Sequence, residues 1–295
     1  MNRPETLKKT LESITGHNFI PKQIVIVDQS EKNDVIQENK RILNEISKKG
    51  IQTVHFYQEK PSLTAARNNA IKFATEEIII CSDDDIEVYD DTLLNISNKM
   101  KDKSISMIAA IDDNMPTKQS ALGYILGTRS FKKRKIGHVT YSMLGRYPEN
   151  VKGEVKTEWA MGCFFVIRKS LMVLWKIKWD EQLTSYAYPE DLDFSYSYYK
   201  LSEFNGLHCI LDENIRIKHM VSNEYRVPSR KSTYMYVINR RYLSYKHNMG
   251  FNSRLAMCWC DFWRFAERFI KNEQPFDIIR AYMICKKEAK KMLKQ

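Results

Sequence analysis

Short runs of apolar residues alternate with longer amphipathic segments along the first hundred residues of the chain. The short runs are rich in β-branched residues, which is typical of buried strands, and the longer segments carry apolar residues at helical spacing. The pattern predicts strands at 23–28, 52–57, from 78, and at 104–111, with helices from residue 4, at 36–48, 62–74 and 90–100. Repeated alternation of strand and helix predicts an α/β fold with a Rossmann-like, mostly parallel sheet flanked by helices, whose ligands bind at the carboxyl ends of the strands.

The stretch 78–88 reads I-I-I-C-S-D-D-D-I-E-V and places three adjacent acids after an apolar run. Alternate residues of an extended chain point to the same side, so we expect Asp83 and Asp85 to converge while Asp84 faces elsewhere. A divalent cation would relieve their repulsion, and Mg²⁺ or Mn²⁺ is usually held by one or two carboxylates plus substrate phosphates. The pattern therefore favours a metal and nucleotide-diphosphate site over a solvated acidic turn. Asp28 ends another predicted strand on the same rim, which suggests one shared crevice.

A second acidic cluster lies in Y-P-E-D-L-D-F, residues 188–194, before an aromatic segment that we expect to be helical. Glu190 or Asp191 could cap that helix, and the functional alternative is a general base in a partly dry cleft. The strand-like run I-R-I-K-H ends in His219. This histidine is either structural or exposed, or it faces the strand-end acids as a third metal ligand or phosphate contact.

Charge and composition narrow the classes of partner. The chain has 295 residues, with 47 Lys and Arg against 36 Asp and Glu, which favours an anionic partner. A nucleic-acid binder would leave the acidic clusters unexplained, so no nucleic acid is expected. A nucleotidyltransferase is a weaker alternative, because only ten glycines are present and none forms a Gly-rich loop after a strand. The six cysteines show no C-x-x-C pairing, which favours reduced thiols in a cytoplasmic setting.

Six blocks along the chain together resemble a known family. In chain order they read N-R-P-E-T-L-K-K-T-L-E-S-I, I-V-I-V-D-Q-S, L-T-A-A-R-N-N-A-I, I-I-I-C-S-D-D-D, G-C-F-F-V-I-R-K-S and Y-P-E-D-L-D-F-S-Y. They resemble the successive blocks of a family 2 glycosyltransferase, and six blocks in the right order are far more specific than any one of them. The resemblance implies the GT-A fold, a nucleotide-sugar donor, with a UDP-sugar as the first candidate, and Mn²⁺ or Mg²⁺ as cofactor.

The resemblance also implies roles on the donor side of the site. Asp28 matches the family's acid that binds the nucleotide base, and Arg67 and Asn68 match the block beside the nucleotide. Asp83 and Asp85 match the D-x-D motif, with Asp84 between them counted among the donor-binding residues.

Further roles concern the metal and the acceptor. Asp85 is implied as the direct metal ligand, with Asp83 nearer the ribose, and His219 resembles a histidine that some members place on the metal or the diphosphate. Asp191 is implied as the catalytic base and Glu190 as the runner-up. The implied reaction is a single inverting displacement.

Two departures from the family pattern bear on these expectations. Members normally begin with a hydrophobic strand directly before the N-R-P-E block, and Met1 stands where that strand would end. We expect the true chain to start upstream; the alternative is a non-catalytic partner protein that keeps the GT-A fold. The Q-x-x-R-W motif of processive synthases is absent, which predicts one sugar transferred per encounter.

The C-terminal segment lies outside the resemblance. We expect a catalytic domain over residues 1–224 and a helical extension over 225–295. Trp259, Trp263 and Phe269 are interleaved there with basic residues, which suits either a helix in a membrane interface or a helix packed on the catalytic domain with its arginines solvated. We therefore expect a cytoplasmic enzyme, peripheral on the inner face of a bacterial membrane, that glycosylates a glycan or lipid-linked acceptor in surface polysaccharide synthesis.

Overall fold

The computed structural model describes residues 2–115, 120–130, 133–184, 188–220 and 229–294. Its N-terminal part alternates helix and strand as the hydrophobic pattern predicts. The elements are α1 (Pro4–Thr15), β1 (Gln23–Asp28), α2 (Asn33–Ser47), β2 (Gln52–Tyr57) and α3 (Leu63–Phe73). Strands β1 and β2 pair in parallel, from Gln23 opposite Gln52 to Asp28 opposite Tyr57.

Local sequence explains these elements. Pro4 begins α1, where its missing N–H costs no helical hydrogen bond. Leu7 and Leu11 lie one turn apart and are buried against Leu43 of α2. The hydroxyl of Ser62 caps α3.

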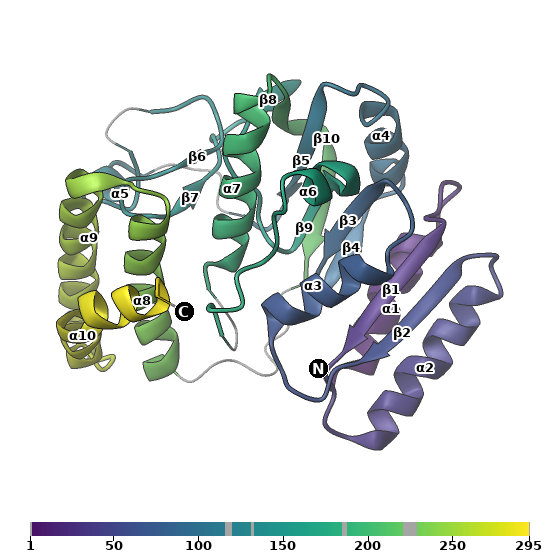
Figure 1. Cartoon of the computed structure of the whole chain (residues 1–295), viewed down its shortest axis with the longest axis horizontal. Helices are drawn as coiled ribbons and strands as arrows, with labels where there is room; N and C mark the ends of the chain where they lie inside the picture. The colour runs from purple at the N-terminus through teal and green to yellow at the C-terminus, as the bar shows by residue number, and fades with distance from the viewer. Residues whose placement is uncertain (1, 116–119, 131–132, 185–187, 221–228, 295) are drawn as a thin grey trace.

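A six-stranded sheet forms the centre of the molecule (Figure 1). Its order is β3-β9-β5-β10-β4, with β8 paired to β10. The strands are β3 (Ile78–Ser82), β4 (Ile86–Val88), β5 (Ile105–Asp112), β8 (Glu154–Lys156), β9 (Phe164–Arg168) and β10 (His208–His219). Strands β3, β5 and β10 run in one direction, and β4, β8 and β9 run against them. In the described part of the chain, no strand pairing joins this sheet to the β1–β2 pair.

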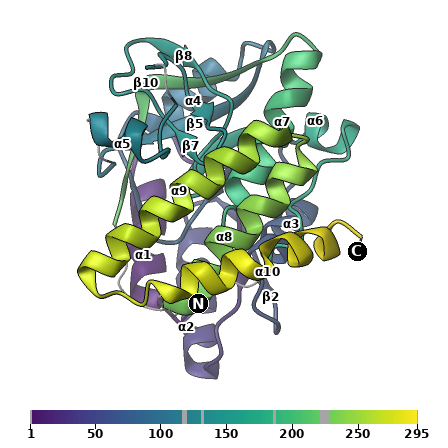
Figure 2. The same ribbon diagram turned by 90° about the vertical axis from the view of Figure 1, so that its left-hand side faces the viewer.

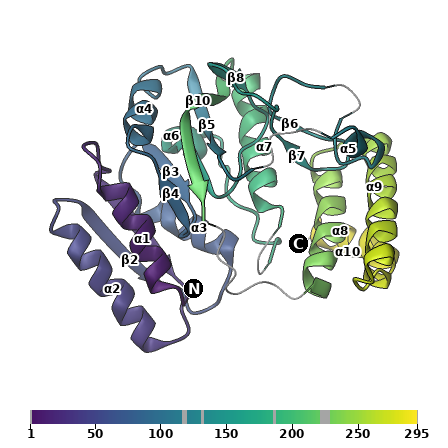
Figure 3. The same cartoon turned by 180° about the vertical axis from the view of Figure 1, so that it is seen from behind.

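Helices cover both faces of the sheet, which confirms the α/β fold class. Helices α6 (Lys169–Leu174) and α7 (Glu190–Phe204) lie on one face, with Trp179, Phe194 and Tyr198 in the core beneath them. Helix α4 (Thr92–Lys99) packs its Leu93 and Ile96 on the other face, and α1 lies on that side as well (Figure 3).

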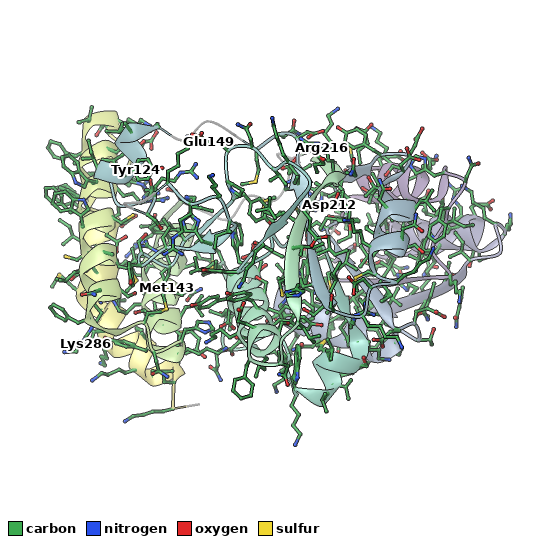
Figure 4. All side chains as sticks on the ribbon, turned by 90° about the horizontal axis from the view of Figure 1, so that it is seen from above. Tyr124, Met143, Glu149, Asp212, Arg216 and Lys286 are labelled. Carbon is green, nitrogen blue, oxygen red and sulfur yellow. The ribbon has the colours of Figure 1, made fainter. Side chains whose placement is uncertain are left out.

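The C-terminal helices are α8 (Ser229–Lys246), α9 (Gly250–Lys271) and α10 (Phe276–Met292). The short elements α5 (Ala121–Ile125), β6 (His138–Val139) and β7 (Gly145–Arg146) adjoin them. Seen from above, Met143 lies between the helical side, marked by Lys286, and the sheet side, marked by Asp212 (Figure 4). Met143 is fully buried in a core that it shares with Leu192 of α7 and Leu243 of α8, so this core contains residues of both parts. The expected boundary at residue 224 lies outside the described residues.

Two apolar stretches do not form one continuous strand in the structure. The stretch 78–88 is broken at its acids into β3 and β4, which lie at opposite ends of the strand order. The apolar run that begins at Glu158 forms a strand only from Phe164, because the segment before it packs as an irregular connection around Trp159 and Gly162. In both places the chain leaves the six-stranded sheet at the edge where the candidate site lies.

Candidate active site

The acidic tripeptide 83–85 crosses the rim of the six-stranded sheet. It leaves the end of β3 and enters β4, which lies beside β10. The backbone N–H of Asp83 donates to the carbonyl of Cys163 at 2.9 Å, and the N–H of Met220 donates to the carbonyl of Asp85 at 2.8 Å. The tripeptide is therefore tied to the end of β10, more than 130 residues further along the chain.

Asp83, Asp85 and His219 offer ligand atoms that all lie within 4.8 Å of one another. Nε2 of His219 lies 3.1 Å from Oδ1 of Asp85, and this hydrogen bond raises the pKa of His219. Two carboxylates and an imidazole nitrogen suit Mn²⁺ or Mg²⁺ when phosphate or water oxygens complete the coordination shell. The three residues predicted as metal ligands are thus brought together, and their donor atoms fit such a cation.

Arg3 lies against the same acids, and sequence reasoning did not single it out. Its Nη1 donates to Oδ2 of Asp85 at 3.2 Å, and its other terminal nitrogen pairs with Asp84. The backbone N–H of Asn2 donates to the hydroxyl of Ser30, just past β1, at 3.0 Å. Residues 2 and 3 therefore run from the end of β1 to the tripeptide. The only signal in the sequence was the position of this arginine within the N-R-P-E block.

Arg67 from α3 joins the metal side of the site to the second acidic cluster. Its Nη1 donates to Oε1 of Glu190 at 2.9 Å, and its Nη2 donates to Oδ1 of Asp83 at 3.1 Å. Burial alone would lower the pKa of Arg67, but the two carboxylates raise it above its ordinary value. Its guanidinium therefore stays charged and holds both acids in place.

Glu190 and Asp191 occupy the first turn of α7. Burial, together with the neighbouring Asp191, raises the pKa of Glu190 to about 8. Burial also raises the pKa of Asp191, although the N–H groups of Leu192 and Gly162 donate to its two carboxylate oxygens at 2.7 and 3.0 Å. Pro189 is the N-cap of α7, so neither acid has the capping role. A buried carboxylate with a raised pKa is suited to general-base chemistry.

Gly162 separates Arg67 from Asp191. A Cβ atom at this position would lie 3.0 Å from Nη2 of Arg67 and 3.0 Å from Cβ of Asp191. The carbonyl of Gly162 also accepts a hydrogen bond from Arg67 at 3.0 Å. The glycine is therefore needed so that the two functional side chains can pack against the backbone of the connection before β9.

Asp28 is buried at the end of β1 within a hydrogen-bond network of the protein itself. Its two oxygens accept from the backbone N–H of Ser30 and from Nδ2 of Asn39, both at 2.9 Å. Nε2 of His55 lies 3.0 Å away. Burial alone would raise the pKa of Asp28, but these hydrogen bonds outweigh it and lower the pKa. Asp28 remains charged at the carboxyl end of its strand.

Asn68, the neighbour of Arg67 on α3, faces a different part of the molecule. Its side chain bonds to both the carbonyl and the N–H of Trp179, each at 2.9 Å, and to Glu181 at 2.8 Å. Successive residues of a helix point about 100° apart, so only one of the pair can face the acids. The structure brings Arg67 into the acidic site and uses Asn68 to fix the loop at 179–181.

A family model described as "Glycosyl transferase family 2" matches residues 1–174. The chain belongs to glycosyltransferase family 2. The matched segment contains Arg67, the acidic tripeptide and Gly162, whereas Glu190, Asp191 and His219 lie beyond it. A search of curated protein sequences found no match.

Solved structures share the GT-A fold with this glycosyltransferase at low sequence identity. GalNAc-T7, solved with UDP, GalNAc and Mn²⁺, is 17% identical with a TM-score of 0.56, and the match covers 86% of this chain and 51% of that one. A mannosyltransferase from Pyrobaculum calidifontis, solved with GDP-Man and Mn²⁺, is 13% identical with a TM-score of 0.55 over 98% and 84% of the two chains. S. aureus TarS 1-349 with UDP-GlcNAc is 14% identical with a TM-score of 0.55 over 95% and 76%. The chain thus spans about half the length of the first of these relatives.

Proposed function

We propose that this glycosyltransferase moves a sugar from a nucleotide-sugar donor to an acceptor hydroxyl by a metal-dependent inverting displacement. The observation that carries the proposal is the convergence of two acidic groups with separate surroundings. One group, Asp83 and Asp85 with His219, has the donor atoms for a divalent cation. The other, the buried Glu190 with the half-buried Asp191, lies on the far side of Arg67.

Each residue of the site has a task in this reaction. Asp83, Asp85 and His219 would hold Mn²⁺ or Mg²⁺, which when bound neutralises charge on the departing nucleotide diphosphate. Asp191 would take the proton of the acceptor hydroxyl. The acceptor oxygen then bonds to the anomeric carbon of the donor sugar while the bond from that carbon to the diphosphate breaks. Glu190 is bound to the Arg67 guanidinium, which favours Asp191 as the base. Asp28 and Asp84 would complete the donor side, and Asn68 would support it indirectly by fixing the loop at 179–181.

The donor and acceptor classes rest on different support. Solved relatives hold UDP, UDP-GlcNAc and GDP-Man, which supports a nucleotide sugar, with UDP-sugars to be tried first. We propose a glycan or lipid-linked acceptor in bacterial surface polysaccharide synthesis at the cytoplasmic face of the membrane. We further propose that residues 225–295 extend the catalytic domain 1–224 as one folded unit, because α8 shares its core.

Donor hydrolysis tests the proposal. The protein is incubated with UDP-, dTDP- and GDP-sugars in Mn²⁺ or in EDTA, and released nucleotide diphosphate is followed. We expect release from one donor, dependent on metal and lost in Asp85→Asn. Once an acceptor is found, Asp191→Asn should lower its glycosylation by roughly 10²-fold or more while donor binding is kept. Failure of the protein to bind any donor with metal would refute the proposal.

A further inference from the structure

Helices α9 and α10 form an outer side of the molecule that no other described element covers. Figure 2 shows both helices lying across this side, in front of α8. In the described part of the chain, no helix is long and apolar enough to cross a membrane. Any contact of these helices with lipid would therefore be made along their length.

Helix α9 departs from the polarity expected for a surface helix, because polar residues are buried on its inner side beside Met257 and Cys260 and large apolar residues lie on its outer side. On its inner side, the hydroxyl of Ser253 bonds to that of Ser244 at 2.8 Å, and Asp261 pairs with the buried Arg240 at 2.8 Å. Its outer side carries five large apolar side chains at spacings of three, four or seven residues, each between 48% and 61% exposed. They are Phe251, Leu255, Trp259, Phe262 and Phe269.

This apolar stripe continues on neighbouring elements. The indole N–H of Trp259 donates to the carbonyl of Ile125 in α5 at 2.5 Å, and Ile125 and Leu122 are themselves exposed. At the other end, the ring of Phe276 in α10 lies edge to face with that of Phe265 in α9, with 6.1 Å between the ring centroids. We call the exposed side chains of 122, 125, 251, 255, 259, 262, 269 and 276 the outer apolar surface. Contiguous exposed apolar side chains on this scale mark an interaction site.

Basic side chains dominate the exposed charge of α9 and α10. Residues 250–294 contain ten Lys and Arg against five Asp and Glu, and two of those acids, Asp261 and Asp277, are buried. The exposed basic residues are Arg254, Lys271, Arg280, Lys286, Lys287, Lys290, Lys291 and Lys294. The exposed charge of the two helices that carry most of the outer apolar surface is therefore strongly positive.

We propose that the outer apolar surface docks on a membrane that contains anionic phospholipid. Aromatic and aliphatic side chains would enter the boundary between headgroups and acyl chains, and the flanking Lys and Arg would meet the phosphates. Two copies of the same chain would bring like charges together, so the charge pattern favours lipid over self-association. The surface lies on the C-terminal helices, apart from Asp85 and Asp191, so docking and transfer can be tested separately.

Vesicle co-sedimentation of the full chain tests the proposal, with no donor or metal present. The vesicles are phosphatidylcholine alone or phosphatidylcholine with about 30% phosphatidylglycerol, which supplies an anionic surface. The test variant is Phe251→Ser with Phe262→Ser and Phe269→Ser. Its matched control changes three apolar residues on α6 and the end of α7 that are at least as exposed, Val173→Ser with Leu174→Ser and Phe204→Ser.

We expect the wild-type chain and the matched control to bind the anionic vesicles, more weakly at high salt, and the test variant to bind at least about tenfold more weakly. Replacing Lys286, Lys287, Lys290 and Lys291 by Gln should also weaken binding to these vesicles. Circular dichroism establishes that each variant is folded. Equal binding by the test variant and its control would overturn the proposal. So would a wild-type dimer in light scattering that the test variant abolishes, if neither protein binds vesicles.

Discussion

Arg67→Met tests whether the guanidinium holds the two acidic groups of the site together. The substitution keeps much of the side-chain volume but removes hydrogen bonds of 2.9 Å to Glu190 and 3.1 Å to Asp83. The side chains of Arg67 and Glu190 are only 10% and 9% exposed, whereas that of Asp83 is 33% exposed and better hydrated. Removing one partner of a buried pair costs about 3–5 kcal/mol. We expect the free energy of unfolding to fall by about 3 kcal/mol where Glu190 is ionised.

The loss of unfolding free energy in Arg67→Met should grow with pH. In the folded protein the pKa of Glu190 is raised from 4.5 to about 8, chiefly by burial. A carboxyl group with a raised folded pKa gives its full stability below the unfolded value and loses it as pH rises through the folded value. Arg67 is one of the groups that lower this pKa. Without Arg67, Glu190 is protonated and neutral at low pH, so little stability is lost there. At high pH Glu190 is an unpaired buried charge, so more stability is lost.

Urea unfolding followed by circular dichroism, in EDTA, at about pH 6 and about pH 9 measures this difference. The matched control is Arg41→Met. Arg41 also donates two hydrogen bonds to carboxylate oxygens, both on Glu38 and at 2.6 and 2.8 Å, but its side chain is 64% exposed. Arg41→Met should cost much less stability than Arg67→Met, because an exposed ion pair is screened by solvent. Adding Glu190→Gln to Arg67→Met should restore part of the stability. Equal losses for the two arginines, or a loss at pH 9 no larger than at pH 6, would refute the reasoning.

Three further predictions concern the same site. Asp85→Asn should weaken Mn²⁺ binding at least about tenfold, measured from the electron paramagnetic resonance signal of free Mn²⁺, because one charged ligand is lost; unchanged binding would place the metal elsewhere. Arg3→Gln should instead tighten Mn²⁺ binding several-fold without donor, since a competing cation leaves Asp85, and weaker binding in the same titration would contradict this. Gly162→Ala should lower stability by about 1–3 kcal/mol in thermal unfolding, because its Cβ would crowd the guanidinium of Arg67; a neutral effect would show that the guanidinium can move.

Local patterns sufficed to predict the elements that carry the site. The bounds of β1 and β2 agree with the predicted strands, because apolar runs of β-branched residues ended in turn signals there. Alternation within the acidic tripeptide predicted that Asp83 and Asp85 would converge and Asp84 would differ. Asp83 and Asp85 do share the candidate metal cluster with His219. The chain bends at these acids and is not extended, and Asp84 pairs with the same Arg3 guanidinium as Asp85.

Contacts between distant segments were beyond the reach of those patterns. Nothing local to Arg3 indicates that it will lie against acids more than 80 residues later in the chain, because that contact depends on how α1 packs beside β4. The direction of Asn68 was equally hidden, because the sequence does not show which of the neighbouring polar residues of α3 faces the acids. For α9 the sequence left two orientations open, and the structure turns the phenylalanines outward while Arg268 bonds inward to Thr233.

The charge balance of the site explains why a buried acidic cluster is stable before any ligand binds. Asp83, Asp85 and Glu190 are each within hydrogen-bond distance of Arg3, Arg67 or His219, so the protein itself supplies the positive charge that a run of acids requires. A divalent cation would therefore compete with an internal guanidinium for Asp85 rather than fill a site of bare carboxylates. Phosphate oxygens of a donor would favour the cation over the guanidinium at Asp85. They add ligands for the cation and give the displaced guanidinium an anionic partner. Metal and donor are consequently expected to bind together more tightly than either does alone.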